Sequence, residues 1–365
     1  MLNNKSYISF KENIKTVQSC NNWSELEELS QKINHQLSIK KVYNTRLREV
    51  EERMSEILCD QSWMGTCANY QLHSGGKRFR AILALISADI FKVDSETAIN
   101  AAVCCEFIHN ASLIHDDLQD RDLLRRGLPT IWNRFGDHTA INLGDYFVSG
   151  SFQALSKINS NHQNICRAIE NLSLTIQTAV KGQSHEILER YNLDLKMKDY
   201  EATARAKTGS LICWPIKLIM ILKGEDQRND GFFKPLYDAG LAYQIQDDLS
   251  DFLGLKDRGL PGRDLKEGKL NVLIMHFLET ATSGERFLLK QFLNKKYESI
   301  SEDDILNWIH IIKSKGIIEK SIEHLISVSK NAIDKSENFS FGLNKIVKFV
   351  VQSILERISE KIKDH

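Results

Sequence analysis

Residues 113–127 read LIHDDLQDRDLLRRG, and residues 243–254 read YQIQDDLSDFLG. Each stretch has acids at positions i, i+1 and i+4: Asp116, Asp117 and Asp120 in the first, and Asp247, Asp248 and Asp251 in the second. On a helix the first and last acid of each set share one face, about 6 Å apart at Cβ. Two such faces set opposite each other would crowd several carboxylates into one cleft, which is energetically unfavourable unless cations bind them. The pattern predicts Mg²⁺, which prefers oxygen ligands and keeps room for substrate phosphates.

Most of the chain is expected to be helical. Only four prolines interrupt its 365 residues, and apolar residues recur at helical spacing from about residue 42 onward. No stretch alternates polar and apolar residues for long enough to build a sheet. Because cofactor sites of helical bundles lie between helices, the repeated motif predicts two facing helices in one bundle. We expect an all-α fold, with one large bundle around a central cavity over residues 41–365.

Residues 1–40 are expected to form an N-terminal helical appendage. The apolar residues at helical spacing in it are Trp23, Leu26, Leu29, Ile33 and Leu37. Such a helix packs on the main body or on the second chain of a dimer, or it docks a partner. The pattern favours packing over a regulatory role.

Composition excludes several classes of protein. Lys+Arg and Asp+Glu are equal at 48 each, so nothing favours nucleic acid or an anionic membrane as a partner. No apolar run approaches the roughly 20 residues that span a bilayer, so stable membrane insertion is not expected. The seven cysteines form no CxxC pair, and the N-terminus lacks the apolar core of a signal peptide. We expect a cytoplasmic protein.

Two cationic runs accompany the first acid motif. Arg125 and Arg126 follow it within two turns, and arginines bind phosphate oxygens through bidentate forks. Residues 75–80 read GGKRFR, where the glycines allow close backbone approach and a helix opening at Lys77 would bind phosphate with Lys77 and Arg80. Alone, GGKRFR is more typical of an ordinary basic turn, and it lacks the P-loop spacing. Beside the acids, both runs predict capture of a diphosphate.

Further polar residues support this prediction, each with an alternative. Lys207 and Thr208 are expected mid-helix, facing a leaving diphosphate unless they are a surface pair. Gln244 shares the face of Asp247 and either binds substrate or is a structural amide. His109 is expected to contact a phosphate, and His115 to be a structural partner of the acid cluster. Surroundings rich in carboxylates and without cysteine favour Mg²⁺ over zinc.

Together these runs resemble the trans-isoprenyl diphosphate synthases, the polyprenyl synthetase family. GGKRFR resembles the family's GGKRxRP, and the two acid runs resemble its two aspartate-rich motifs. GDYFVSGSF, GQSHEI and KTGSL resemble its GDYLLA, GQxxD and KTG signatures. The resemblance covers roughly residues 45–350 in the family's order. It implies an isoprenoid-synthase bundle, usually a homodimer, that joins isopentenyl diphosphate to an allylic diphosphate to make a longer trans-prenyl diphosphate.

The resemblance also implies a role for each matching residue. Asp116, Asp120 and Asp247 would be the principal Mg²⁺ ligands, supported by Asp117, Asp248 and Asp251, with three ions per site once substrate is bound. Isopentenyl diphosphate would be held by Lys77, Arg80, His109 and Arg126. The allylic diphosphate would be faced by Arg125 and by the catalytic residues Lys207, Thr208 and Gln244.

The chain departs from the family pattern at three places. Ala81 stands where proline is usual. Residues 259–265 read GLPGRDL in place of GKPxGxDL, so the loop lysine is missing, and Arg258 or Arg263 is the candidate replacement. KLNVLI at residues 269–274 replaces KxTxPL. These changes concern the allylic side of the site more than the metals.

The residues before the first acids bear on product length. In the family, the residues four and five before the first acid often form the floor of the tunnel in which the product grows. Here they are Ser112 and Ala111, both small, and Phe107 lies about one turn deeper. We expect products of C20 or longer in preference to C15, stopped by Phe107 or by a neighbouring helix.

Two other functions compete with chain elongation. A class I terpene cyclase on the same scaffold would use the same metals but would need only one diphosphate site. The presence of Lys77, Arg80 and Arg126, which would form a second site, argues against it. A regulatory subunit of a prenyl synthase would not need two intact acid motifs, so their presence argues against this function. The altered loop and the appendage are compatible with it.

Overall fold

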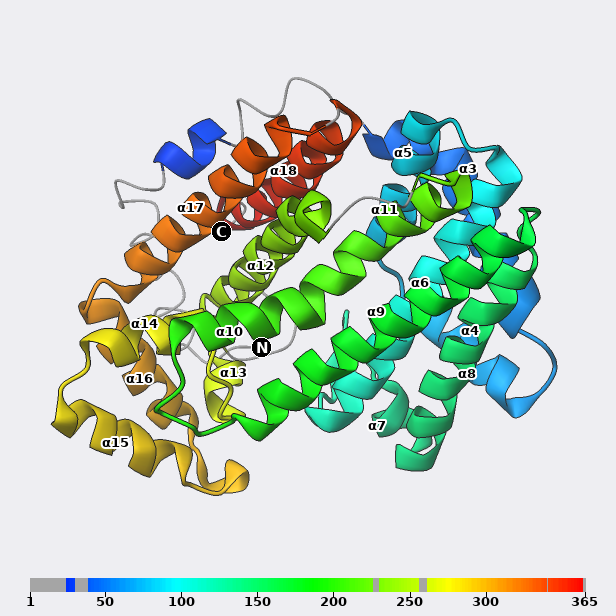
Figure 1. Cartoon of the computed structure of the whole chain (residues 1–365). Helices are drawn as coiled ribbons and strands as arrows, with labels where there is room; N and C mark the ends of the chain where they lie inside the picture. The colour runs from blue at the N-terminus through cyan, green and yellow to red at the C-terminus, as the bar shows by residue number, and fades with distance from the viewer. Residues whose placement is uncertain (1–23, 30–38, 226–229, 256–260, 340, 364–365) are drawn as a thin grey trace. The chain divides into compact units, whose positions relative to one another are not determined.

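The computed structural model describes residues 24–29, 39–225, 230–255, 261–339 and 341–363, most of which are helical (Figure 1). The only strands in these ranges are β1 (Leu124–Arg125) and β2 (Leu128–Pro129). The prediction of an all-α fold is therefore confirmed. The small hairpin was not predicted, because strands of two residues show no alternation to detect.

The described chain divides into two compact units. The first-motif unit, which carries the first acid motif, comprises Leu37–Thr178 and Ser210–Phe233. Besides the hairpin it contains α3 (Ile39–Leu58), α4 (Trp63–His73), α5 (Phe79–Phe91), α6 (Ser95–Gln119), α7 (Ile131–Phe135), α8 (Asp137–Ser156), the first part of α9 (His162–Leu188) and α11 (Ser210–Lys223).

The second-motif unit comprises Ala179–Gly209 and Lys234–His365 with the described residues 24–29. It contains the end of α9, α10 (Met197–Ala204), the π-helical turn η2 (Arg205–Gly209), most of α12 (Asp230–Phe252), α13 (Arg263–Lys266), α14 (Val272–Thr280), α15 (Ser283–Leu293), the 3₁₀ turn η3 (Tyr297–Ser299), α16 (Glu302–Ser314), α17 (Ile317–Glu337) and α18 (Phe341–Lys363).

α6 is the central helix of the first-motif unit. It packs against α3, α5, α8 and α11, and most of its side chains are buried. It begins after Asp94, whose side chain accepts a hydrogen bond from the Thr97 N–H at 3.0 Å and so caps the helix. Small and apolar residues on all sides suit a helix that is surrounded by neighbours. The first acid motif thus ends a firmly held helix.

In the second-motif unit, η2 is held between two helices by glycines. A Cβ on Gly240 of α12 would lie 2.3 Å from the Gly209 Cα, and a Cβ on Gly182 of α9 would lie 2.6 Å from the Lys207 nitrogen. Only glycine permits backbones to approach this closely. A single π-helical turn inside an otherwise α-helical stretch is frequent at functional sites.

Part of the expected N-terminal appendage lies within the described residues. Residues 24–29 are helical, Leu26 is fully buried, and Glu25 pairs with Lys330 of α17. This segment therefore packs on the second-motif unit, as the amphipathic pattern favours. The rest of the appendage lies outside the described residues, so its boundary at residue 40 stays a prediction.

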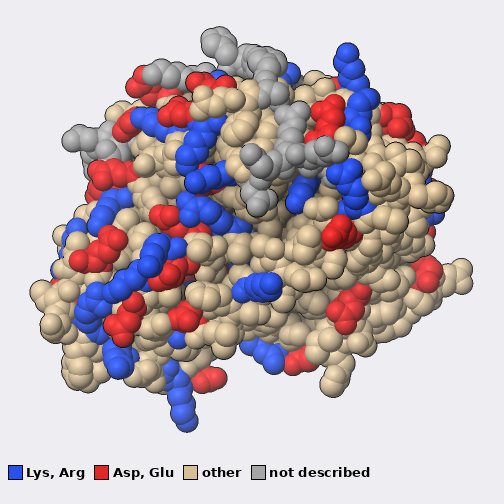
Figure 2. Space-filling view, in the orientation of Figure 1, with Lys and Arg blue, Asp and Glu red and all other residues tan. Residues whose placement is uncertain are grey.

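The surface agrees with the balanced composition. Figure 2 shows acidic and basic side chains interspersed over the face in view. Within the described ranges, no helix has both the length and the apolar character that a bilayer crossing requires.

Candidate active site

The first acid motif ends α6. Asp116 lies on the last turn, and Asp120 caps the helix, with its N–H donating to the Asp116 carbonyl at 2.9 Å. The expected relation between i and i+4 therefore holds, and both carboxylates belong to one face. Asp116 is half-buried, whereas Asp117 and Asp120 are buried.

The hairpin after this motif sends its two arginines to different partners. Arg125 of β1 pairs with Leu128 of β2, so the connecting turn consists of Arg126 and Gly127. Both turn residues have positive φ, at 55° and 78°, as in the two-residue turns that match the twist of paired strands. Thr130 anchors the hairpin, because its hydroxyl donates to the Asp122 carbonyl at 2.6 Å.

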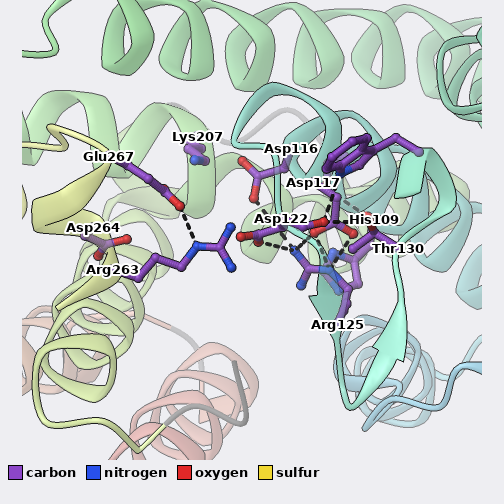
Figure 3. A network of polar contacts seen from close by, with 12 residues as sticks. His109, Asp116, Asp117, Asp122, Arg125, Thr130, Lys207, Arg263, Asp264 and Glu267 are labelled. Carbon is purple, nitrogen blue, oxygen red and sulfur yellow. Dashed lines mark hydrogen bonds and ion pairs between the residues drawn. The ribbon is translucent and has the colours of Figure 1, made fainter. Parts of the chain in front are cut away.

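Arg125 turns back to the acid motif and forms a fork with Asp117 (Figure 3). Its Nε lies 2.8 Å from both Asp117 oxygens, and its Nη2 lies 2.6 Å from Oδ1. The same Nη2 lies 3.9 Å from Asp116 and 4.0 Å from Asp122. Burial raises the pKa of Asp117 to about 6, and the positive charge of Arg125 opposes that rise. Asp117 thus anchors the arginine that follows its motif.

Arg126 reaches the glycines of GGKRFR. Its Nη1 donates to the Gly75 carbonyl, and a Cβ on Gly76 would lie 2.8 Å from that same nitrogen. Gly75 and Gly76 have φ of +86° and +139°, which few other residues adopt. The glycines therefore permit close approach to the backbone, as expected. The group that approaches in this structure is the Arg126 guanidinium.

The helix after this loop begins later than expected. α5 starts at Phe79 and not at Lys77, because Arg78 adopts the left-handed conformation with φ of 48°. Lys77 is exposed on the loop. Arg78, which the sequence reasoning missed, is buried and donates to the Leu72 carbonyl and to Glu51, both at 2.8 Å. It ties the loop to α3 and α4.

His109 lies among four arginines. Burial lowers its pKa well below the ordinary value, and the positive charges of Arg80, Arg126, Arg125 and Arg78 lower it further. The ring is therefore neutral at neutral pH. Its Nδ1 is buried, and no group among the described residues hydrogen-bonds to it. The structure thus brings together four predicted substrate-binding residues: Arg80, His109, Arg125 and Arg126.

Glu106 supports the same region and was also missed. It is 2% exposed, and its Oε1 accepts a hydrogen bond from the Ala81 N–H at 3.0 Å. It thereby caps the start of α5, where Arg78 makes no side-chain cap bond, and a negative charge is favourable at that end of a helix. The proline usual in the family at the place of Ala81 has no N–H to donate. The only signal in the sequence is a single acid in the apolar lead-in CCEFIHN.

In the second-motif unit, Lys207 and Thr208 lie on η2. They were expected mid-helix, and the turn is continuous with α10 and α11 but has π-helical geometry. The Lys207 Nζ lies 2.9 Å from Glu186 of α9. Glu186 belongs to GQSHEI, which the sequence singled out without assigning this residue a role.

The second acid motif lies within α12 and joins Thr208 through hydrogen bonds. The Thr208 hydroxyl donates to Gln244, and the Gln244 amide donates to Asp248, each at 2.8 Å. Burial, and then the negative charge of Asp264, raise the pKa of Asp248 to about 7. Asp247 is half-buried and Asp251 is buried.

The loop after the second motif contains the short helix α13. Arg263 opens it and pairs with Glu267 at 2.6 Å (Figure 3). Lys269, the first residue of KLNVLI, lies 3.0 Å from Glu267 and 3.9 Å from Asp264, and the sequence reasoning did not assign it. Arg258, the other candidate for the missing loop lysine, lies outside the described residues.

The residues expected to set product length lie on α6. Ala111 is buried, and the half-buried Ser112 donates to the His109 carbonyl at 2.8 Å. Phe107 is fully buried and meets Phe147 of α8 edge to face, with ring centroids 5.6 Å apart.

His115 was expected to support the acid cluster, and this prediction is wrong. Its Nε2 lies 3.4 Å from the Ile141 carbonyl and 3.9 Å from Asp145, both on α8. A Cβ on Gly144 of α8 would lie 2.0 Å from that nitrogen. The reason is geometric: on a helix, the side chains of His115 and Asp116 point about 100° apart, so His115 faces α8 and not the acids.

Among the residues that the structure describes, no group of three or more His, Cys, Asp or Glu side chains is placed to hold a metal ion. Both motifs nevertheless offer carboxylate oxygens, the donors that Mg²⁺ prefers.

Comparisons with known proteins agree with these motifs. The polyprenyl synthetase family model matches residues 61–309. A geranylgeranyl pyrophosphate synthase of Geoglobus acetivorans is 32% identical over 256 residues, which cover 68% of this chain and 79% of that protein. Component 2 of the heptaprenyl diphosphate synthase of Bacillus subtilis is 30% identical over 278 residues, covering 75% of this chain and 76% of that one.

The fold is similar to that of solved structures. A decaprenyl diphosphate synthase from Rhodobacter capsulatus matches with a TM-score of 0.76 and 23% identity, covering 88% of this chain and 98% of that one. The family match extends over most of this chain and includes both acid motifs and both cationic runs. The chain therefore belongs to the polyprenyl synthetase family.

Proposed function

We propose that this chain is a Mg²⁺-dependent prenyltransferase that condenses isopentenyl diphosphate head-to-tail with an allylic diphosphate. Membership of the polyprenyl synthetase family supports the reaction class. The observation that carries the proposal is the gathering of four arginines around a neutral His109, beside the first acid motif. Positive charge of this density is suited to a diphosphate, which offers several oxygens to guanidinium forks.

In this proposal, Lys77, Arg80, His109 and Arg126 bind isopentenyl diphosphate. The link between Arg126 and the glycine loop supports this assignment, because the loop and the arginine then move as one part. Glu106 contributes by fixing the start of α5, from which Arg80 projects. A neutral His109 adds no positive charge to the arginines, so it contributes to binding through a hydrogen bond.

The allylic diphosphate is assigned to Arg125, Lys207, Thr208, Gln244 and Arg263. The hydrogen bond between Thr208 and Gln244 supports a shared role, because it orients both side chains. Lys207 and Arg263 each pair with a glutamate, which orients their charges until a diphosphate competes for them. Arg263 therefore supplies the cation that the missing loop lysine supplies elsewhere in the family.

The acids fit Mg²⁺ by their chemistry. Asp116, Asp120 and Asp247 are proposed as the principal ligands, with Asp117, Asp248 and Asp251 in support and three ions per site. Mg²⁺ is generally held by one or two carboxylates together with substrate phosphates, so a diphosphate is part of the proposed coordination. When bound, the ions supply Lewis-acid stabilisation of the negative charge that develops on the leaving diphosphate.

The residues of the chain then control a reaction with a cationic intermediate. The allylic C–O bond breaks, and its electron pair leaves with the diphosphate, whose growing charge the fixed cations stabilise. The double bond of isopentenyl diphosphate forms the new C–C bond, and a proton is lost to the departed diphosphate. Apolar helix walls must exclude water, which would otherwise quench the cation. The apolar lead-in of α6 provides such a wall.

We further propose products of C20 or longer and a homodimer that works in the cytosol. The small Ala111 and Ser112 support long products, with the Phe107–Phe147 pair as the stop. The free thiols of the described cysteines are in keeping with a reducing compartment. The Bacillus subtilis relative is named as one component of its synthase, so a second kind of chain is the competing partner.

The test is a turnover assay with defined primers. Pure protein, Mg²⁺ and labelled isopentenyl diphosphate are incubated with each of the C5, C10, C15 and C20 allylic diphosphates, and the products are sized. Linear diphosphates support the proposal, and Asp116→Asn should abolish them. Cyclic hydrocarbons would indicate a terpene cyclase instead. Absence of turnover with every primer, together with a mixed complex on gel filtration, would indicate a regulatory subunit.

A further inference from the structure

Asp248, the second acid of the second motif, is held by several hydrogen bonds. It is 3% exposed and accepts three hydrogen bonds. The Tyr200 hydroxyl donates to Oδ2 at 2.7 Å, the Val272 N–H donates to Oδ2 at 3.0 Å, and the Gln244 amide donates to Oδ1 at 2.8 Å. A carboxylate has about four lone-pair sites, so most of its capacity is already used by the protein.

One branch of this network reaches the π-helical turn. The Gln244 Oε1 accepts the Thr208 hydroxyl at 2.8 Å while its Nε2 donates to Asp248. The amide therefore has one satisfactory orientation, since rotating it by half a turn would set its N–H₂ group against the Thr208 hydroxyl and its oxygen against a carboxylate. Asp248 thus orients Gln244, and Gln244 orients Thr208.

The other branch reaches the start of α14. Val272 is the first residue of that helix, and Asn271 caps it by accepting from the Ile274 N–H at 3.1 Å. The stretch before α14 is held by Asp251, the third acid of the motif. The Asp251 carboxylate accepts from the Asp264 N–H at 3.0 Å. Its carbonyl accepts from the Gly262 N–H at 3.1 Å.

The two acids therefore fix both ends of residues 262–272. This segment contains Arg263 and Lys269, whose side chains both pair with Glu267. Tyr200 comes from α10 and contributes a hydroxyl that is buried with Asp248. It thereby joins α10 to the network of α12, η2 and α14.

We propose that Tyr200 and Asp248 form a positioning pair, which orients the Thr208–Gln244 bond on one side and the Arg263–Lys269 segment on the other. The supporting role proposed for Asp248 is thus exerted through these bonds and not as a metal ligand, whereas Asp247, half-buried one residue earlier, is the proposed ligand. Three protein donors already occupy most of the lone-pair sites of Asp248, so a metal ion there would compete with them in a buried position. This inference rests on the proposed function of the site.

The experiment compares conservative variants at four positions. Tyr200→Phe removes one hydroxyl and keeps the ring. Asp248→Asn leaves one oxygen for three donors, and Asp247→Asn removes the charge of the proposed ligand. Tyr243→Phe is the matched control, since it removes from the same unit a hydroxyl whose bond from Arg357, at 2.8 Å, is not one of the three that Asp248 accepts. For each, kcat, the KM for Mg²⁺ and amide hydrogen exchange over residues 262–272 are measured.

Tyr200→Phe and Asp248→Asn should each lower kcat by about tenfold or more, the scale of a lost hydrogen bond to a charged group. Both should leave the KM for Mg²⁺ unchanged and speed exchange across residues 262–272. Asp247→Asn should raise the KM for Mg²⁺ without altering exchange, and Tyr243→Phe should alter none of these.

Two results would overturn the inference: a raised KM for Mg²⁺ in Asp248→Asn comparable to that in Asp247→Asn, or unchanged exchange in Tyr200→Phe. Hydrogen exchange needs no substrate. If the wild-type protein turned over no primer, the proposed function would fail, and the exchange data would still decide whether Tyr200 and Asp248 hold the segment.

Discussion

Gly240→Ala should destabilise the second-motif unit, because it pushes two backbones apart. The added Cβ would lie 2.3 Å from the Gly209 Cα and 2.8 Å from the Gly209 nitrogen. Carbon atoms in contact normally stay about 3.5–4.0 Å apart, so α12 and η2 must separate by about 1 Å. Neither atom belongs to a flexible side chain, and no rotamer change relieves the clash. We expect the free energy of unfolding to fall by about 3 kcal/mol, the upper end of the range for overpacking.

The same displacement should impair turnover. η2 holds Lys207 against Glu186 and Thr208 against Gln244, and both contacts depend on where the turn sits relative to its two helices. Misplacement of catalytic groups by about 1 Å can reduce a rate by about 10²-fold. A loss of kcat of that size should therefore accompany the loss of stability, even at temperatures where the variant remains folded.

Gly284→Ala is the matched control. This glycine lies in the first turn of α15, and the nearest atom to its added Cβ is the Thr282 Oγ1 at 4.0 Å. Alanine has the higher helix propensity, so this variant should be as stable as wild type or slightly more stable. Urea unfolding followed by far-ultraviolet circular dichroism gives the two free energies, and turnover gives the two rates. Equal behaviour of both variants would refute the reasoning.

Three further predictions concern the first-motif unit. Gly76→Ala should raise the KM for isopentenyl diphosphate more than Gly75→Ala does, since only its Cβ meets Arg126; equal effects in steady-state kinetics would contradict the contact. Ala111→Phe should shorten the product made from farnesyl diphosphate, and an unchanged product would refute the tunnel assignment. The pKa of His109 is lowered in the folded protein, so this residue binds a proton more readily in the unfolded chain. The free energy of unfolding should therefore decrease as pH falls through about 6.5, the ordinary pKa of histidine. His109→Gln should weaken that loss in urea unfolding between about pH 7 and pH 5, and an unaltered pH dependence would disprove it.

The acids and the arginines of the site were predictable because their spacing is local. Acids at i and i+4 share a helix face whatever surrounds the helix, and the structure keeps that relation at Asp116 and Asp120. The two arginines after the first motif were likewise expected near a diphosphate. That Arg125 contacts Asp117 while Arg126 contacts Gly75 follows from the two-residue turn between β1 and β2. Such a short turn leaves no periodic signal in the sequence.

The parts that could not be predicted depend on contacts distant in sequence. Glu106 reaches the start of α5 from 25 residues away, and Asp248 reaches Val272 across 24 residues. The left-handed conformation of Arg78 delayed the start of α5 by two residues relative to the expectation at Lys77. A single sequence does not reveal such pairings, because nothing in the composition of either segment requires the other.

The two acid motifs have the same spacing, and the protein uses their second acids in the same way. Asp117 is engaged by the Arg125 fork, and Asp248 by Tyr200, Gln244 and the Val272 N–H. In each unit the second acid is buried and joined to the segment that follows its motif, and each of those segments carries cations. The first acid is half-buried in both. In each pair of aspartates, therefore, the first carboxylate stays partly accessible, and its neighbour fixes the cationic segment that follows the motif.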